Sequence, residues 1–309
     1  MSARSPTLDS VSSQRQTEGA PEIERSYKAR AVESFLDIHF YRKVGFRLAL
    51  LFAKLRMTPG QVTLCGGAAG IAAGHLYYYR DLRWNLLGMA LHILSNTLDN
   101  ADGQLARLTK QGSRGGRALD GLADHLVFVS IYAHLCLRYT AGGGSPFVWL
   151  LGLAAGLSHS LQSAAADYFR NAWLYFAEGK ARAELESSSF LQTEFDRLRW
   201  PENPWQKFLL RLHLNYTREQ EWLAPGLLAL QRRARGPNEK AVSLAYQSAS
   251  RRLLKWQNLL ATNPRMLLLF ALLLVGQPVW YFVFELTLFN LFLAHLLREQ
   301  AVVCRRLLA

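Results

Sequence analysis

The feature that most constrains this fold is a series of apolar blocks separated by short or basic connections. The six blocks cover residues 60–79, 84–98, 118–137, 146–169, 253–276 and 278–297. A helix needs about 20 residues to cross roughly 30 Å of hydrocarbon, and several blocks reach that length only with polar ends. The sequence Asn263-Pro264 interrupts the fifth block. The pattern predicts an all-α integral membrane protein with a six-helix transmembrane bundle.

The charge distribution predicts how this bundle is oriented. The formal net charge is +13, and the basic residues gather in alternate connections. The other connections, 80–83, 141–146 and 276–278, are short. Since Lys and Arg favour cytoplasmic loops, both termini are expected in the cytoplasm, at an inner or plasma membrane. A pI near 9.9 is also typical of nucleic-acid binding, but topology explains the charge more simply, so we expect no nucleic-acid partner.

Composition shifts divide the chain into five segments. We expect a disordered cytoplasmic tail at 1–28, an interfacial amphipathic helix at 29–57, transmembrane helices 1–4 at 58–177, a cytoplasmic helical insertion at 178–252, and transmembrane helices 5–6 with a C-terminal tail at 253–309. The alternative for the second segment is an ordinary helix that packs on the bundle. The insertion either covers a site or forms an interface, or it only supports the structure.

Four aspartates stand at fixed intervals between the second and third blocks. The pattern is Asp99-x-x-Asp102-Gly103-x-x-Ala106-Arg107, eight residues, then Gly116-x-x-x-Asp120-x-x-x-Asp124. On helices, residues three or four apart share one face, so two antiparallel helices would each present two carboxylates. Ionised groups at membrane depth usually mark a functional site.

Four carboxylates that converge need a counter-charge, because like charges raise one another's pKa. Oxygen ligands favour Mg²⁺ or a similar ion, and two such ions can hold a diphosphate. Arg107 adds a forked donor for phosphate oxygens, and Ser113 adds a hydroxyl group. Gly103, Ala106 and Gly116 are small enough to let a ligand approach. The alternative, a set of ion pairs between helices, explains one or two aspartates but not four.

At these residues the sequence resembles the CDP-alcohol phosphatidyltransferase family, whose defining motif is matched at every fixed position. The resemblance implies that an alcohol hydroxyl displaces CMP from a CDP-linked donor, with two Mg²⁺ or Mn²⁺ ions as cofactors. By this likeness Asp99, Asp102 and Asp120 bind metal. Asp124 contributes to the second metal site and acts as the catalytic base. The resemblance also implies a homodimer in contact with membrane lipid.

The resemblance assigns a second group of residues to the CDP moiety. These residues are Gly60, Gln61, Val62, Thr63, Gly103, Ala106, Arg107, Ser113 and Gly116. The first four belong to a Thr-Pro-x-x-x-Thr element that begins at Thr58, in which Gly60 replaces the usual Asn or Asp. Gly121 follows Asp120 where users of CDP-choline or CDP-ethanolamine often have His, which favours CDP-diacylglycerol as the donor. The alternative is a soluble CDP-alcohol donor with a lipid acceptor.

The fourth apolar block carries a polar run that suggests an acceptor pocket. Gln162, Asp167 and Arg170 are the candidates, while His159 and its neighbours fall on the same face. These side chains either line the pocket or bond to neighbouring helices, as polar groups in membranes often do. The acceptor remains open among inositol phosphate, glycerol phosphate, serine and other alcohols.

Two functions from other classes fit the sequence less well. A cation transporter would spread its charges over several spans and break helices at the midplane, whereas here the carboxylates lie at one rim. An inactive scaffold that binds anionic lipid would not need all four aspartates. We therefore expect a membrane enzyme of phospholipid biosynthesis with a cytoplasmic active site.

Overall fold

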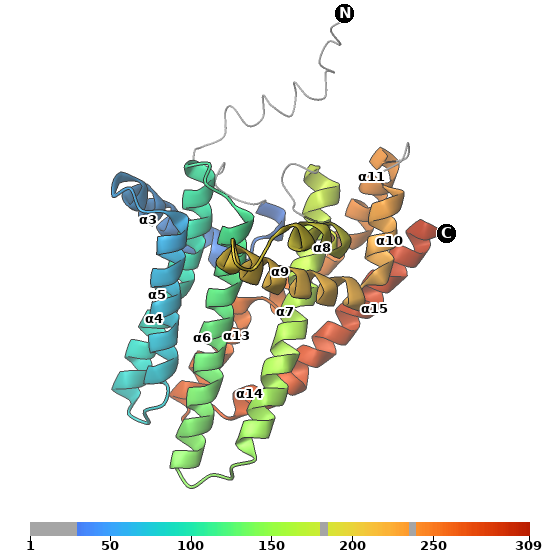
Figure 1. Cartoon of the computed structure of the whole chain (residues 1–309). Coiled ribbons are helices and arrows are strands. Elements are labelled where there is room, and N and C mark those ends of the chain that lie inside the picture. Colours follow the sequence, from blue (N-terminus) through green and yellow to red (C-terminus); the bar gives the residue numbers. More distant parts are fainter. Residues whose placement is uncertain (1–29, 180–184, 235–238) are drawn as a thin grey trace, which may run out of the picture.

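The computed structural model describes residues 30–179, 185–234 and 239–309, and in these ranges it is helical without any strand (Figure 1). The predicted tail at 1–28 lies outside the described residues. The elements are η1 (Arg30–Val32), η2 (Asp37–Tyr41), α3 (Arg42–Lys54), α4 (Pro59–Leu76), α5 (Leu82–Leu108), α6 (Arg114–Ala141), α7 (Val148–Glu178), α8 (Ser188–Arg197), α9 (Pro204–Leu223), α10 (Pro225–Arg233), α11 (Glu239–Ser250), η3 (Arg251–Leu253), α12 (Leu254–Leu259), α13 (Thr262–Leu274), α14 (Trp280–Leu286) and α15 (Leu288–Leu308).

Helices α4 to α7 are antiparallel neighbours that carry the central part of the bundle. Their starts are set by side-chain caps: Thr58 and Gln61 form a capping box at α4, Asp81 caps α5 and Ser113 caps α6. The short connections lie at the lower end in Figure 1, and the basic connections lie at the upper end with α3. The first four predicted apolar blocks therefore correspond to helices, as expected.

Glycines on α4 allow the helices of the motif to approach closely. A Cβ atom at Gly70 would lie 2.5 Å from Val127 of α6 and 2.7 Å from Ser95 of α5. At Gly74 it would lie 2.5 Å from the Ser130 hydroxyl oxygen. Ser95 and Ser130 also donate hydrogen bonds to backbone carbonyls of α4. Close backbone contact and interhelical hydrogen bonds replace large apolar side chains here.

Helix α3 packs on α5 with one face and leaves the other face open. Gly45 and Ala49 are buried, and Gln104 of α5 donates a 3.1 Å hydrogen bond to the carbonyl of Arg42. Leu50 and Leu51 are exposed beside basic residues. A helix of mixed character is therefore present within the predicted segment 29–57, and it packs on the bundle.

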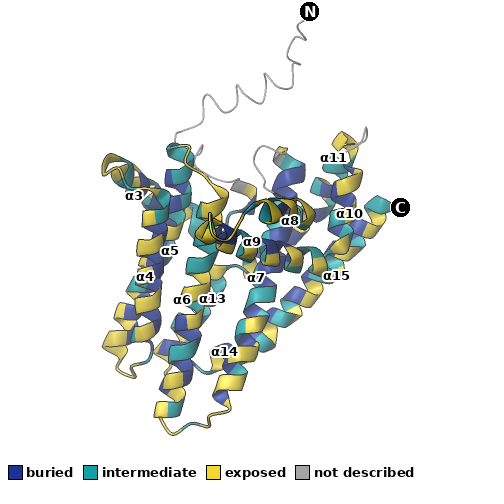
Figure 2. Cartoon of the chain, viewed as in Figure 1, coloured by how far each residue is buried: buried dark blue, intermediate teal, exposed yellow. Residues whose placement is uncertain are grey.

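The segment predicted as an insertion contributes to the main core. Leu227 and Leu230 of α10 and Tyr246 of α11 are fully buried in one apolar cluster with residues of α7 and α15 (Figure 2). Gly226 packs against Cys304 of α15 at 3.1 Å from its ideal Cβ position. These helices are therefore an integral part of the bundle at its upper end.

The fifth predicted span differs from the expectation of one helix. Residues 253–276 form the short α12 and the 13-residue α13, with a break at Leu260 and Ala261. The guanidinium of Arg265 donates two hydrogen bonds to the Leu260 carbonyl, which terminates α12. Pro264 lies in the first turn of α13, where its missing N–H costs nothing.

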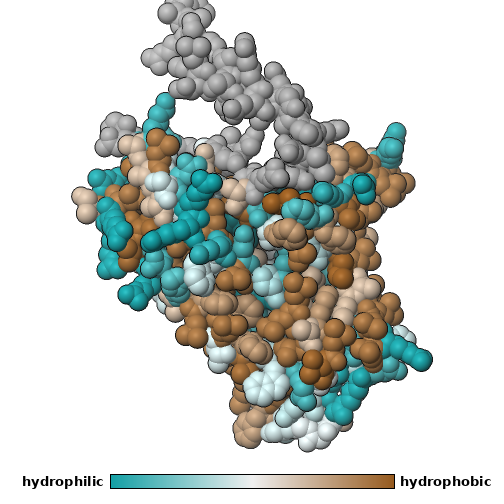
Figure 3. Space-filling model, turned by 180° about the vertical axis from the view of Figure 1, so that it is seen from behind, coloured by the Kyte–Doolittle hydropathy of each residue, from teal (hydrophilic) through white to brown (hydrophobic). Residues whose placement is uncertain are grey.

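Within the described residues, one helical stretch, Trp280–Leu308, is long and apolar enough to cross a membrane by length and composition. Large apolar side chains are nevertheless exposed on other helices, among them Val129 at 64%, Leu153 at 62% and Val275 at 73%. Figure 3 shows apolar side chains over the middle of the molecule, with hydrophilic side chains among them at its lower end.

Candidate active site

Three of the four motif aspartates meet at the seam between α5 and α6. Asp99, Asp102 and Asp120 each offer a carboxylate oxygen, and these oxygens lie within 4.8 Å of one another. Asp102 is buried, Asp120 is half-buried and Asp99 is exposed. Three oxygen donors at this spacing fit a divalent cation, which prefers oxygen ligands.

Asp124 lies one turn further along α6 and is not part of this group of three. Its carboxylate is still near enough to Asp99 and Asp102 for their charges to interact. Its side chain is exposed.

Thr63 of α4 fixes the buried aspartate. Its hydroxyl group lies 2.5 Å from Oδ2 of Asp102 and 3.1 Å from the carbonyl of Pro59. Thr63 is itself 6% exposed. The sequence predicts that Thr63 lies beside the nucleotide, and in the structure its hydroxyl group contacts a motif carboxylate. The pairing joins residues 39 positions apart, so no local spacing indicated it.

The small residues of the motif surround Arg107 and the start of α6. The guanidinium of Arg107 lies 3.6 Å from the ideal Cβ position of Gly103, so a Cβ atom there would be in van der Waals contact with it. Ser113 accepts a 3.0 Å hydrogen bond from the backbone N–H of Gly116. Ala106 lies on the same helix as Gly103, half-buried. Ser113 is therefore the N-cap of α6, and the positive end of α6 points toward the loop.

Side chains at the start of α4 are less available than the resemblance implied. Val62 is fully buried in an apolar cluster. The Gln61 side chain accepts a 2.8 Å hydrogen bond from the N–H of Thr58. Gly60 packs against Leu119 of α6 at 3.4 Å from its ideal Cβ position. A ligand here would meet backbone and Thr63 more readily than the side chains of Gln61 or Val62.

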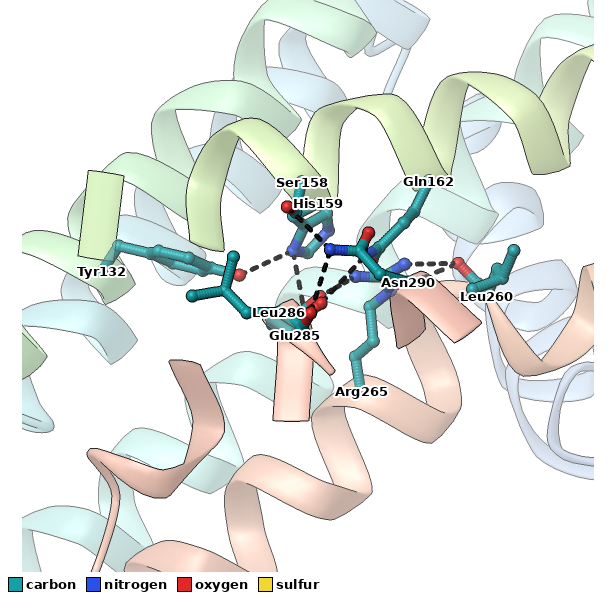
Figure 4. Close-up of polar contacts among 9 residues, drawn as sticks. All are labelled: Tyr132, Ser158, His159, Gln162, Leu260, Arg265, Glu285, Leu286 and Asn290. Atoms are coloured by element: carbon teal, nitrogen blue, oxygen red, sulfur yellow. Dashed lines mark hydrogen bonds and ion pairs between the residues drawn. The ribbon is translucent and has the colours of Figure 1, made fainter. Parts of the chain in front are cut away.

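Gln162 joins helices rather than lining a pocket. It is fully buried, and its Nε2 donates hydrogen bonds to the carbonyl of Glu285 at 3.0 Å and to Asn290 at 2.8 Å. Figure 4 shows this amide among side chains of α7, α14 and α15. The alternative that polar residues of the fourth block bond to neighbouring helices therefore fits Gln162, and these contacts lend no support to its assignment to an acceptor pocket.

A buried ion pair lies at the centre of the same network (Figure 4). Arg265 of α13 contacts Glu285 at 2.6 Å, and both side chains are almost fully buried. His159 lies 3.5 Å from Glu285 and 3.0 Å from the Tyr132 hydroxyl group. His159 is thus a packed helix-joining residue. No sequence pattern indicated the pair, since Arg265 and Glu285 stand in separate apolar blocks.

Asp167 and Arg170 lie further along α7, outside this network. Asp167 accepts hydrogen bonds from Asn171 at 3.2 Å and from Gln220 of α9 at 3.3 Å. Arg170 is half-buried, and among the described residues its buried Nε has no hydrogen-bond acceptor. These two candidates for the acceptor pocket remain compatible with ligand binding.

The profile of the CDP-alcohol phosphatidyltransferase family matches residues 56–170. This segment is a CDP-alcohol phosphatidyltransferase domain. It contains α4, α5, α6 and most of α7, and so all four motif aspartates. The domain resemblance inferred from the aspartate motif is confirmed.

One relative of named function matches this chain over a length similar to that of the family match. The phosphatidylinositol phosphate synthase of Streptomyces avermitilis is 31% identical over 106 residues. The match covers 34% of this chain and 42% of the relative's length. The chain thus matches less than half of that enzyme. The helices that follow the CDP-alcohol phosphatidyltransferase domain lie beyond the family match.

Proposed function

We propose that this protein is a membrane enzyme that transfers a phosphatidyl group from CDP-diacylglycerol to an alcohol and releases CMP. The observation that carries the proposal is the convergence of Asp99, Asp102 and Asp120 within 4.8 Å inside a CDP-alcohol phosphatidyltransferase domain. Such a site supplies the oxygen ligands that hold cations against a diphosphate.

The carboxylates of Asp99, Asp102 and Asp120, with a contribution from Asp124, would hold two divalent ions. Bound Mg²⁺ or Mn²⁺ would neutralise the diphosphate and the departing CMP. Thr63 keeps Asp102 in one orientation. Arg107 and the N-terminus of α6 add positive charge for phosphate oxygens. Gly103 leaves space over Arg107 for the donor.

Asp124 would act on the acceptor. In the reaction the acceptor oxygen bonds to the phosphorus that carries diacylglycerol, and the bond from that phosphorus to the bridging oxygen breaks. CMP leaves with the electron pair, and the carboxylate of Asp124 takes the hydroxyl proton. The exposed position of Asp124 near the other aspartates supports this assignment.

The acceptor would be a phosphorylated alcohol of the inositol phosphate type. Arg170 supports this choice, because a half-buried guanidinium with an unused Nε suits a phosphate group. The name of the Streptomyces relative, phosphatidylinositol phosphate synthase, supports the same choice. A neutral acceptor would not need the positive charge of Arg170.

The bundle would span the membrane with its basic end in the cytoplasm. The exposed leucine and valine side chains of α6, α7 and α13 form an apolar surface, whose exposure to water is unfavourable. The basic connections all lie at the end that carries the aspartates. Lipid-linked donor and water-soluble acceptor would then meet at the inner leaflet.

The test is CMP release by the purified protein in lipid nanodiscs with Mg²⁺ and CDP-diacylglycerol. Inositol phosphate, inositol, glycerol phosphate and serine are supplied one at a time. We expect release with inositol phosphate above all others, and none with EDTA. Release only from CDP-choline or CDP-ethanolamine with diacylglycerol would replace the donor proposed here by a soluble CDP-alcohol. No release from any donor would overturn the function.

A further inference from the structure

Helices α8 and α9 pack on each other and run across α6 and α7 near the upper, basic end of the bundle (Figure 1). Helix α9 is bonded to α7 through Gln220, whose Nε2 donates hydrogen bonds to the carbonyl of Ala164 and to Oδ2 of Asp167, each at 3.3 Å. Leu209 and Leu214 of α9 are also buried. One side of α9 is therefore packed on the protein, and the helix lies across the bundle rather than along it.

The opposite side of α9 is a stripe of exposed residues: Phe208, Arg211, Asn215, Arg218 and Trp222. Their three- and four-residue spacing places them on one face of the helix. Phe208 is 38% exposed and Trp222 is 74% exposed. The stripe contains two arginines and no carboxylate. It therefore combines large aromatic side chains with positive charge.

The two arginines of the stripe contact neutral groups. Nη2 of Arg218 donates a 2.7 Å hydrogen bond to the side-chain oxygen of Gln192 of α8. The guanidinium of Arg211 lies 5.4 Å from the ring centre of Phe195. Neither contact supplies a negative charge, so both guanidinium groups suit an anionic partner such as a phosphate group.

The exposed tryptophans of the described residues fall into two groups. The first group lies beside the short connections at the lower end of the bundle: Trp84, Trp149 and Trp280. The second group belongs to α8, α9 and the turn between them: Trp200, Trp205 and Trp222. Trp concentrates at both surfaces of a membrane, where its ring contacts lipid and its N–H contacts water. The two groups have the distribution expected of two such belts.

The distance between these belts along α7 is close to the thickness of a bilayer. Helix α9 meets α7 at Ala164 and Asp167. At a rise of about 1.5 Å per residue, these two positions stand about 22 and 27 Å beyond Trp149. The hydrocarbon core is about 30 Å thick. Leu153 and Leu157, which lie between, are 62% and 61% exposed. A bundle that spans the membrane would therefore carry α9 at the inner boundary of the lipid.

A second copy of this chain fits the stripe less well than lipid does. Two copies related by a two-fold axis bring the same surface patch of each together. The arginines of one copy would then face those of the other, and juxtaposed like charges are unfavourable. Anionic lipid headgroups instead attract basic side chains close to the membrane surface.

We propose that the stripe of α9 binds anionic lipid at the inner leaflet of the membrane. Phe208 and Trp222 lie at the boundary between acyl chains and headgroups, and Arg211 and Arg218 contact lipid phosphate groups. This inference rests on the proposed placement of the bundle across the membrane. The stripe lies outside the segment 56–170 that the family profile matches. The lipid contact therefore belongs to the part of the chain that follows the family domain.

The lipid contact is linked to the motif through Arg114, the first residue of α6. The guanidinium of Arg114 lies 2.9 Å from the carboxylate of Glu186 and 3.5 Å from that of Glu194 of α8. It also lies 5.0 Å from the ring centre of Phe190. Lipid bound to α9 thus also holds the start of the helix that carries Asp120.

The test uses a fluorophore attached to Asn215→Cys in the full chain, reconstituted in lipid nanodiscs. Cys65→Ala removes the exposed native thiol, and the other two cysteines are buried. The control label is attached to Ser248→Cys, an exposed position of α11. One quencher is a lipid with a nitroxide at the top of its acyl chain, and the other is iodide in the water. We expect the lipid nitroxide to quench the Asn215 label at least about threefold more than the Ser248 label, because an interfacial helix lies among the lipid headgroups. Iodide should give the opposite order.

A second measurement tests the charge of the lipid. The nitroxide is placed on phosphatidylglycerol or on phosphatidylcholine at the same mole fraction. Phosphatidylglycerol should quench the Asn215 label at least about twofold more, because arginines at the surface attract anionic lipid. Arg211→Gln combined with Arg218→Gln should abolish this difference. The control, Arg232→Gln combined with Arg251→Gln, removes two exposed charges elsewhere and should retain it.

Three results would overturn the inference. Equal quenching of the Asn215 and Ser248 labels by the lipid nitroxide would show that α9 does not touch lipid. An Asn215 label shielded from both quenchers would show that protein, such as a second copy, covers the stripe. Equal quenching by the two lipids would exclude an anionic partner.

A label at Leu153→Cys of α7 separates these results from a failure of the proposed placement. A Leu153 label that acyl-chain nitroxides do not quench would remove the bundle from the membrane, and the inference would fall with it. With the Leu153 label quenched, the Asn215 label alone decides the inference. The proposed reaction is tested independently by CMP release.

Discussion

At the scale of single residues, the site depends on the groups that orient each carboxylate. Asp102 is 6% exposed, and the Thr63 hydroxyl group contacts its Oδ2 across the interface of α4 and α5. Partners that orient metal ligands commonly contribute as much to metal binding as a ligand's own geometry. The role of Thr63 can therefore be separated from that of the aspartates by replacing only its hydroxyl group.

Thr63→Val removes the hydroxyl and keeps the shape of the side chain. We expect the Mg²⁺ concentration for half-maximal activity to rise by about tenfold or more, because Asp102 loses its orienting contact. Thr63→Ser retains the hydroxyl and is expected to stay near the wild type. A Mg²⁺ titration of CMP release measures the effect. Equal Mg²⁺ requirements in the two variants would show that the contact is not needed.

The variant Asp124→Asn tests whether Asp124 is the base that takes the proton of the acceptor hydroxyl. The amide has nearly the same size but cannot take the proton of the acceptor hydroxyl, so transfer should fall by at least about a hundredfold. CDP should still bind, because Asp99, Asp102 and Asp120 keep their carboxylates in this variant. Equilibrium binding of labelled CDP with Mg²⁺ provides the control measurement. Near-normal turnover in this variant would remove Asp124 from the role of base.

At the scale of the elements, the glycine face of α4 determines how closely the motif helices pack. A Cβ atom at Gly74 would lie 2.5 Å from Ser130 Oγ and 2.8 Å from the backbone nitrogen of Ile131. The backbone of α6 cannot yield to such a contact without moving the helix. The positions of Asp120 and Asp124 therefore depend on a residue that is far from both in sequence.

Gly74→Ala should push α4 away from α6 and destabilise the protein by about 1–3 kcal/mol. Gly121→Ala is the matched control, because a Cβ atom there meets nothing within 4 Å. Alanine favours helices over glycine, so the control should be neutral or slightly stabilising. Thermal unfolding in detergent distinguishes the two. A Gly74→Ala protein as stable as the wild type would show that the two helices can separate freely.

The ion pair of Arg265 and Glu285 joins α13 to α14. The effects of replacing its two partners on the free energy of unfolding should therefore be strongly coupled. Arg265→Met leaves the Glu285 carboxylate buried without its cation, which costs about 3–5 kcal/mol. Arg265→Met combined with Glu285→Leu removes both charges and should be more stable than either single variant. Unfolding free energies of the four proteins form the measurement. Additive losses would contradict the coupling.

Features that depend on local sequence were predicted, whereas features that depend on contacts between distant residues were not. Apolar composition and the three- and four-residue spacing of the aspartates are local, and both correctly predicted helices and a shared carboxylate face. The break at Leu260 depends on Arg265, and the role of Gln162 depends on Asn290. Contacts of this kind join residues on different helices, so helical periodicity alone does not reveal them.

At the scale of the whole molecule, the two ends of the bundle differ in charge and in content. One end carries only short connections such as 142–147, whereas the other carries α3, the motif loop and helices α8 to α11 (Figure 1). Between them the surface exposes many apolar side chains. A bundle placed across a membrane would have its short connections outside and its aspartates at the cytoplasmic surface.

Labelling of single cysteines tests this orientation. Cys136 and Cys304 are buried, so replacing the exposed Cys65 by Ala gives a background of low reactivity. In that background Ser145→Cys lies in a short connection and Ser189→Cys lies in α8, and both positions are exposed. A membrane-impermeant maleimide should label Ser145→Cys in intact cells, but Ser189→Cys only after permeabilisation, because the reagent cannot cross the lipid. Labelling after denaturation controls for expression. Labelling of Ser189→Cys in intact cells would place the aspartates on the outer side and so contradict the proposed orientation.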